Sequence, residues 1–67
     1  MTVAKVSEIT SSSSKSFNDA IEKGIKRANK TLKNISSAWI ADQEVEIANG
    51  KVTTYRVRMR ITFVLEG

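Results

Sequence analysis

Residues 52–65 read VTTYRVRMRITFVL, and this stretch decides the fold. Its odd-numbered positions from Tyr55 to Leu65 are apolar, whereas arginine occupies even-numbered positions 56, 58 and 60. A period of two with one apolar row is typical of a β-strand that buries one face. The sequence therefore predicts a long strand with an arginine-bearing face, and the other segments must pair with it or cover it.

Residues 39–48, WIADQEVEIA, form the predicted partner of this strand because they also alternate with a period of two. The odd positions, from Trp39 to Ile47, make up the row that we expect to face the core. The even positions carry the acidic residues Asp42, Glu44 and Glu46. An acidic row is thus expected to lie beside the arginine row.

Asn49-Gly50 marks the turn between these two strands. A two-residue turn would set the apolar row of one strand against the polar row of the other. We therefore predict a three-residue loop, either 48–50 or 49–51, which aligns the two apolar rows. The predicted cross-strand pairs are Asp42 opposite Arg56 or Arg58, and Glu44 opposite Thr54 or Arg56.

The N-terminal half of the chain supplies two further predicted elements. Residues 3–9 are rich in Val and Ile and indicate a first strand, and the serine run that follows indicates a loop with Ser13 as helix N-cap. Apolar residues then recur every three or four positions over 17–35, which predicts an amphipathic helix of about 20 residues. Gly24 lies on its apolar stripe, where a close approach of the sheet backbone would explain a glycine.

These elements predict an α+β fold in the order β-α-β-β, with a three-stranded antiparallel sheet packed on one helix. A right-handed crossover through the helix would leave the first and second strands parallel to each other. The third strand would then lie antiparallel between them. We expect residues 1–67 to form a single domain, since a chain this short supports only one core.

The composition excludes several classes of chemistry. The 67 residues include no cysteine, histidine or proline, which excludes disulfides, Cys/His zinc sites and histidine-based catalytic triads. Arginines are expected to neutralise the acidic row, so its carboxylates are not suited to act as general acids or bases, and we expect that the protein is not an enzyme. The first residues lack the layout of a secretory signal, and no apolar run approaches the roughly 20 residues that span a bilayer. The expected location is the cytoplasm, with no membrane partner.

The lengths of the predicted elements favour self-association. A helix of about 20 residues spans roughly 30 Å, whereas a strand of 14 or 15 residues approaches roughly 50 Å. Phe63 and Leu65 would then have no cover within the chain. Long apolar strand ends are seldom left bare, so we expect copies of the chain to shield one another.

The order and spacing of several short pieces resemble the dodecin family. The matching pieces are Val3-x-Lys5-Val6, Ser16-Phe17, Arg27-Ala28-x-Lys30-Thr31, Asp42-Gln43-x-Val45-Glu46-Ile47, and Tyr55 with the closing Phe63-x-Leu65-Glu66. The resemblance covers nearly the whole chain. It implies a dodecin-like fold and a homo-oligomeric shell of twelve subunits. It also implies storage or binding of a small-molecule ligand at the subunit interfaces without catalysis, the ligand being a flavin, either riboflavin or FMN.

The resemblance also implies where a ligand would bind. In the family's register, Ser37 stands at the position of the flavin-stacking tryptophan, and Arg56 stands at the position of a glutamine. Trp39 lies two places after the usual tryptophan position. The candidate ligand-binding residues are Ser37, Trp39, Asp42 and Arg56, and we expect no metal ligand. Packing of Trp39 between subunits, and pairing of Arg56 with the acidic row instead of with a ligand phosphate, stay open as alternatives.

Two other functions stay open. The first is a basic nucleic-acid-binding module built on the lysine-rich helix, which is disfavoured because no aromatic residue interleaves with those lysines. The second is a structural assembly that binds no ligand, or that binds a cation on the row of Asp42, Glu44 and Glu46. The nearby arginines argue against a calcium site because they neutralise the carboxylates that it needs.

Overall fold

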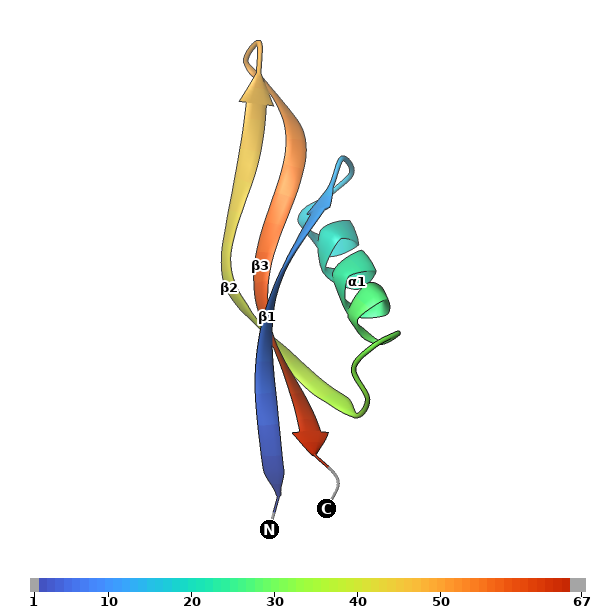
Figure 1. The fold of residues 1–67 in the computed structure, drawn as a ribbon. Helices are drawn as coiled ribbons and strands as arrows, with labels where there is room; N and C mark the ends of the chain where they lie inside the picture. Colours follow the sequence, from blue (N-terminus) through green and yellow to red (C-terminus); the bar gives the residue numbers. More distant parts are fainter. Residues whose placement is uncertain (1, 66–67) are drawn as a thin grey trace.

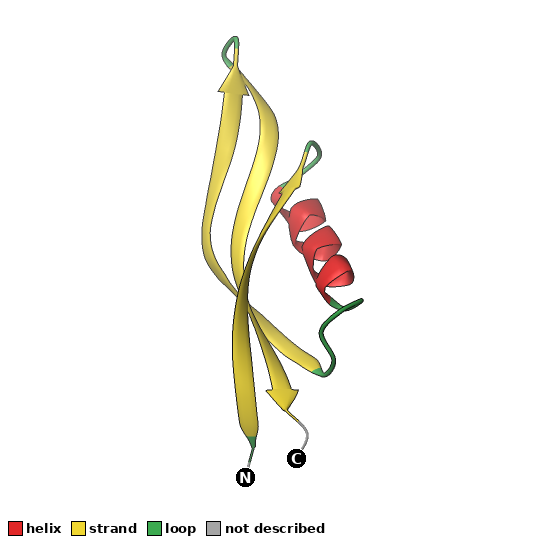
Figure 2. Ribbon diagram, viewed as in Figure 1, coloured by secondary structure: helices red, strands yellow, loops and turns green. Residues whose placement is uncertain are grey.

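Three long strands form one sheet, and a helix covers part of one of its faces, as Figure 1 and Figure 2 show. The computed structural model describes residues 2–65. Along the chain the elements are β1 (Val3–Ser13), α1 (Phe17–Ala28), β2 (Ile35–Ala48) and β3 (Lys51–Leu65). The predicted β-α-β-β order is therefore confirmed. Glu66, part of the closing motif noted in the sequence, lies outside the described residues.

The strand order in the sheet is β1-β3-β2, with β3 in the centre. Both outer strands pair with β3 in antiparallel orientation, so β1 and β2 run in the same direction. This confirms the predicted three-stranded antiparallel sheet and the predicted central position of the last strand. Within residues 2–65, α1 is too short to cross a bilayer and no other helix qualifies.

The core lies between α1 and the odd-numbered row of β3. Ala20, Val57 and Met59 are fully buried, and partly buried apolar side chains surround them. Those surrounding residues are Ile9, Phe17, Ile21, Ile25 and Ile40. Burying one row of β3 leaves the even-numbered row on the opposite side of the sheet. We call this side, turned away from α1, the outer face.

β1 is longer than the sequence predicts, and the helix cap is a different serine. The first three residues of the serine run lie inside β1, which extends to Ser13, paired with Tyr55. The prediction that Ser13 caps the helix is wrong: Ser16 is the N-cap, and its Oγ accepts a hydrogen bond from the Asp19 amide at 3.0 Å. Ser13 is buried and donates a hydrogen bond to the Asp19 carboxylate. Ser11 and Ser13 face the helix, where their small side chains allow it to pack closely on β1.

The helix is shorter than the apolar periodicity predicts. It has 12 residues and ends at Ala28, where the amides of Thr31 and Leu32 both donate to the Ala28 carbonyl in a tight turn. The prediction that the helix reaches Ile35 is wrong because Ile35 begins β2 and pairs with Phe63. Sheet pairing at this end of β3 thus overrides the helical pattern.

The β2–β3 turn has two residues, so the predicted three-residue loop is wrong. Asn49 and Gly50 both have positive φ angles, 53° and 74°, as a type I′ hairpin turn requires. The apolar rows still align because the register shifts by one residue between Glu46 and Ile47, where Thr53 is the extra residue on β3. The alignment was therefore predicted correctly, but a bulge achieves it instead of a longer loop.

The sheet extends well beyond the helix. The described chain measures 52 × 19 × 13 Å, whereas twelve helical residues span only about 18 Å. Figure 1 shows α1 beside the middle of the sheet, with the β2–β3 hairpin projecting past one of its ends, and the start of β1 and the end of β3 projecting past the other. Large apolar side chains are exposed towards both ends: Val3, Val6, Ile47, Val52 and Leu65. The mismatch in length is larger than the sequence predicts.

Gly24 is where the helix comes closest to the sheet. A Cβ atom at this position would lie 2.6 Å from Met59 Cε and 2.9 Å from Ser11 Cβ. The predicted close approach is present, but the contacting atoms belong to side chains instead of to the sheet backbone. Met59 can move its terminal methyl group, whereas the Cβ of Ser11 is fixed by the backbone of β1.

We predict that Gly24→Ala destabilises the protein. Alanine raises helix propensity by about 1 kcal/mol, but overpacking a tight interface costs about 1–3 kcal/mol, so we expect a net loss of about 1 kcal/mol. Urea unfolding followed by circular dichroism at a fixed protein concentration measures the change. Glu22→Ala, at an exposed position of the same helix, is the control. An increase in stability for Gly24→Ala would contradict the close approach.

Candidate functional site

The four residues predicted to bind a ligand all lie on the outer face. Ser37 pairs with Thr62, Trp39 with Arg60, and Asp42 with Arg58. Arg56 belongs to the same even-numbered row of β3 and pairs with Glu44. The register of β2 against β3 therefore brings the predicted residues to one side of the sheet. They do not form a single cluster on it.

A second β-bulge decides the position of Trp39. Ile40 pairs with Met59 and Asp42 with Arg58, so Ala41 is an extra residue on β2. The extra residue reverses the alternation of side chains, and Trp39 points to the outer face instead of to the core. The prediction that Trp39 belongs to the core-facing row is therefore wrong. Its side chain is 68% exposed.

Trp39 has a cationic neighbour that the sequence analysis did not single out. The guanidinium carbon of Arg60 lies 5.6 Å from the centroid of the tryptophan ring, within the range of a cation–π interaction. Across the sheet, Arg60 Nε lies 3.5 Å from Glu8 Oε2. Ser37 and Thr62 contribute hydroxyl groups in the neighbouring row. We call Ser37, Trp39, Arg60 and Thr62 the tryptophan cluster.

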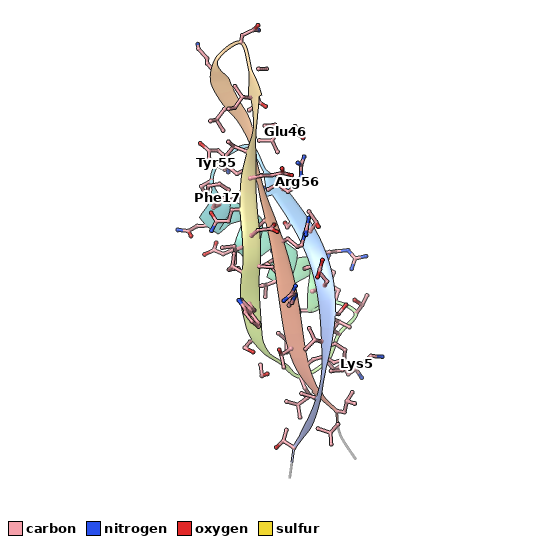
Figure 3. The ribbon with its side chains drawn as sticks, turned by 90° about the vertical axis from the view of Figure 1, so that its left-hand side faces the viewer. Lys5, Phe17, Glu46, Tyr55 and Arg56 are labelled. Atoms are coloured by element: carbon pink, nitrogen blue, oxygen red, sulfur yellow. The ribbon has the colours of Figure 1, made fainter. Side chains whose placement is uncertain are left out.

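Arg56 is held by two carboxylates. Its Nη1 atom lies 2.6 Å from Glu44 Oε1, and its Nη2 atom donates a hydrogen bond to Glu46 Oε1. Figure 3 shows Arg56 and Glu46 side by side. The hydrogen bond from Arg56 and its positive charge lower the pKa of Glu46, and the two glutamates raise the pKa of Arg56. The structure thus favours pairing of Arg56 with the acidic row, one of the two alternatives left open by the sequence.

Arg58 lies between the two clusters and is shared by two elements. Its Nη1 atom is 3.4 Å from Asp42 Oδ2, and its Nε atom is 3.8 Å from Glu8 Oε1. Of the two registers that the sequence left open, the structure has the one that pairs Asp42 with Arg58 and Glu44 with Arg56. The ion pairs of the outer face in residues 2–65 join three arginines to four carboxylates, so these seven side chains together carry a charge of −1, although the whole chain has +4.

Trp39 and Arg56 do not meet within one chain. Arg60, the partner of Trp39, lies four residues from Arg56 along β3, which corresponds to about 13 Å. A ligand ring on Trp39 would therefore contact Arg60 before Arg56. Sequence reasoning missed Arg60 because it placed Trp39 on the wrong face; the arginine row itself was visible in the period-two pattern.

Residues 2–65 contain neither an enclosed pocket nor a group of three acidic, histidine or cysteine side chains that could hold a metal ion. The outer face is an open surface with an aromatic ring near one end. Its carboxylates are engaged by arginines, as the distances above show. The arrangement can stack a flat ring on Trp39 and can place a positive charge beside that ring.

Comparisons with known proteins agree with this fold. The profile of the dodecin family matches residues 3–66. The structure is similar to a dodecin from Streptomyces davaonensis, with a TM-score of 0.92 and 26% identity over 98% of this chain and 97% of that one. It is also similar to a mutant of Thermus thermophilus dodecin, with a TM-score of 0.93 and 27% identity over the full length of both chains.

A third similar structure is a calcium dodecin from Mycobacterium tuberculosis, described as a calcium-chelating antigen. The TM-score is 0.82, with 28% identity over 96% of this chain and 91% of that one. No curated protein sequence matches the chain. The family match and these neighbours together support a small dodecin-type ligand-binding protein with the predicted fold.

We predict that the ion pair of Glu46 with Arg56 makes stability depend on pH in the acid range. The pKa of Glu46 is lower in the folded chain than its ordinary value of 4.5, so the unfolded chain binds the proton more readily. The contribution is therefore fully present above about pH 4.5 and is lost as the pH falls through the lowered pKa. When unfolding is measured between pH 2 and 7, the free energy of unfolding should fall less steeply at acid pH for Glu46→Gln than for the parent protein.

Glu22→Gln controls for the removal of a surface carboxylate in this experiment. Some acid loss remains in Glu46→Gln, because Ser13 and Lys23 also lower the pKa of Asp19. If the free energy of unfolding fell equally with decreasing pH in the parent protein and in Glu46→Gln, the pair would not stabilise the fold.

Proposed function

The chain belongs to the dodecin family, and on that premise we propose that it is a non-enzymatic protein that assembles from identical copies and binds a small flat ligand at their interfaces. The proposed assembly is a dodecamer, and the proposed ligand is a flavin, riboflavin or FMN, held for storage. Residues 1–67 act as one dodecin-like domain, in the cytoplasm. The observation that carries the proposal is the exposed Trp39 ring on the outer face.

Self-association is supported by the apolar side chains that the helix leaves uncovered. Ile47 is 65% exposed and Val52 45% exposed in the projecting hairpin, while Val3 and Leu65, 57% and 45% exposed, pair at the opposite end. Burial of apolar surface stabilises by about 25 cal/mol per Å², so these ends gain free energy when another surface covers them. A second copy of the chain is the proposed occupant, because dodecin-like neighbours share the same long sheet and short helix.

Ligand binding is supported by the chemistry of the tryptophan cluster. An exposed indole ring offers a flat apolar face, and ring systems stack on it in offset geometry. The hydroxyl groups of Ser37 and Thr62 lie in the next row of the same face and can donate hydrogen bonds to polar atoms at a ring edge. Asp42 and Arg56, the other two predicted residues, lie farther along the face. Asp42, opposite Arg58, is one row from Trp39, whereas Arg56 is two rows away and would meet the same ligand only from a second subunit.

Binding without catalysis is supported by the state of the carboxylates. A general acid that works near neutral pH needs a raised pKa, which requires an apolar setting. Glu46 has the opposite environment because Arg56 lowers its pKa. Asp42 and Glu44 likewise have arginine partners.

A cation-binding assembly is a second candidate, which the calcium dodecin neighbour favours. Calcium needs six to eight oxygen ligands, several of them free carboxylates. The row of Asp42, Glu44 and Glu46 faces Arg56 and Arg58, and each carboxylate would have to give up an arginine to bind calcium. Flavin binding is the better supported proposal for this chain.

We predict that the purified protein has the mass of about twelve subunits in light scattering. Ile47→Lys combined with Val52→Lys should yield smaller species, because charged side chains would be buried without partners in the interface. Thr10→Lys adds a charge at an exposed polar position of β1 and should leave the mass unchanged. A folded monomer for the parent protein would contradict the proposed assembly.

We predict that riboflavin and FMN lose fluorescence on binding to the assembled protein at micromolar concentration. Trp39→Ala should weaken binding at least roughly tenfold, because the stacking surface is lost, whereas Trp39→Phe should retain part of it. Thr10→Ala, on the same face, is the control. Absence of quenching in the parent protein would contradict flavin binding. The proposed assembly would still be tested separately by the measured mass.

A further inference from the structure

We propose that Arg60 makes the tryptophan cluster selective for flat aromatic ligands that carry a negative charge. This inference rests on the proposed ligand binding at Trp39 and adds the chemical class of the ligand and the residue that selects it. Arg60 belongs to the arginine row seen in the sequence but was not one of the four candidate ligand-binding residues.

The first support is the position of Arg60 against the ring. Its guanidinium carbon is 5.6 Å from the ring centroid of Trp39, and the two residues are direct partners across β2 and β3. The Arg60 side chain is 47% exposed, so the guanidinium can turn towards a bound molecule. A ring that stacks on the face of Trp39 beside Arg60 lies against the guanidinium or displaces it to the ring edge. In both cases the positive charge stays within reach of the ligand.

The second support is the unequal neutralisation of the three arginines on this face. Arg56 has two carboxylates, one at 2.6 Å and the other closer still. Arg58 pairs with Asp42, with Nη1 3.4 Å from Oδ2, and with one oxygen of Glu8, with Nε 3.8 Å from Oε1. Among the ion pairs of residues 2–65, Arg60 has only the other oxygen of Glu8, at 3.5 Å. The least neutralised of these arginines is therefore the one beside the tryptophan.

A ligand anion can take the place of Glu8 on Arg60. Guanidinium groups bind phosphate and carboxylate in a two-point geometry, and such charge-assisted hydrogen bonds are stronger than the long contact to Glu8. Arg56 would have to leave two close carboxylates to do the same. The phosphate of a flavin nucleotide is therefore assigned to Arg60, and not to Arg56 or Arg58.

Riboflavin and FMN provide the test, because they share one ring system and differ by a phosphate. Dissociation constants for both are measured by flavin fluorescence on the assembled parent protein and on Arg60→Gln, Arg60→Lys and Glu8→Gln. We expect the parent to prefer FMN by roughly two- to fivefold, the range of a partly exposed ion pair. Arg60→Gln should remove the preference while riboflavin still binds, and Arg60→Lys should keep part of it. Glu8→Gln should increase it, because the competing carboxylate is gone.

Arg27→Gln removes the same charge from the exposed surface of α1 and is the matched control. A parent-like preference in Arg60→Gln, or loss of the preference in Arg56→Gln instead, would overturn the assignment to Arg60. Failure of the parent protein to bind either flavin would overturn flavin binding itself, and the inference with it. Glu8→Gln keeps Arg60 in place, so it gives an answer even if substitution of Arg60 prevents assembly.

Discussion

The alternation of side chains along β3 is the constraint on which the rest of the structure depends. The strand lies in the centre of the sheet, so its odd-numbered row must be covered and its even-numbered row must be paired. The helix supplies the cover with small residues, Ala20 and Gly24, that allow close packing against Met59. The flanking strands supply carboxylates for the arginines. One strand thus separates an aliphatic core from a charged surface in a chain of 67 residues.

Much of this could be predicted from the sequence because a period of two or of 3.6 is a strong local signal. The need to align two apolar rows restricts the register to two possibilities, and the structure has the one that pairs Asp42 with Arg58 and Glu44 with Arg56. The ends of elements could not be predicted in the same way. Leu32 continues the helical pattern, but sheet pairing from Ile35 onward decides where the helix must stop. The serines before α1 suit a loop or an edge strand equally well, and only the tertiary structure distinguishes them.

The position of Trp39 was the largest error, and its cause is specific. Alternation predicts a face only while each residue has one partner, and the bulge at Ala41 breaks that condition. Alanine carries no local signal for a bulge, in contrast to Asn49-Gly50, whose positive φ angles are typical of the pair. The resemblance to the dodecin family also did not predict the position of the Trp39 ring, because Ser37 occupies the position where the family has its tryptophan. The candidate site could therefore be assigned to a face only by the register of the folded sheet.

The bulge at Ala41 has a consequence for how such a surface could diversify. Deleting that one residue would remove the bulge but keep Ile40 opposite Met59 and Trp39 opposite Arg60, so every other side chain of the segment would stay on its present face. Loss or gain of a residue at this bulge would then change the local twist of the strand and leave the aromatic patch in place. The surface would therefore diversify by point substitutions on the outer face, and a gap at this bulge carries less information about ligand preference than residue identities do.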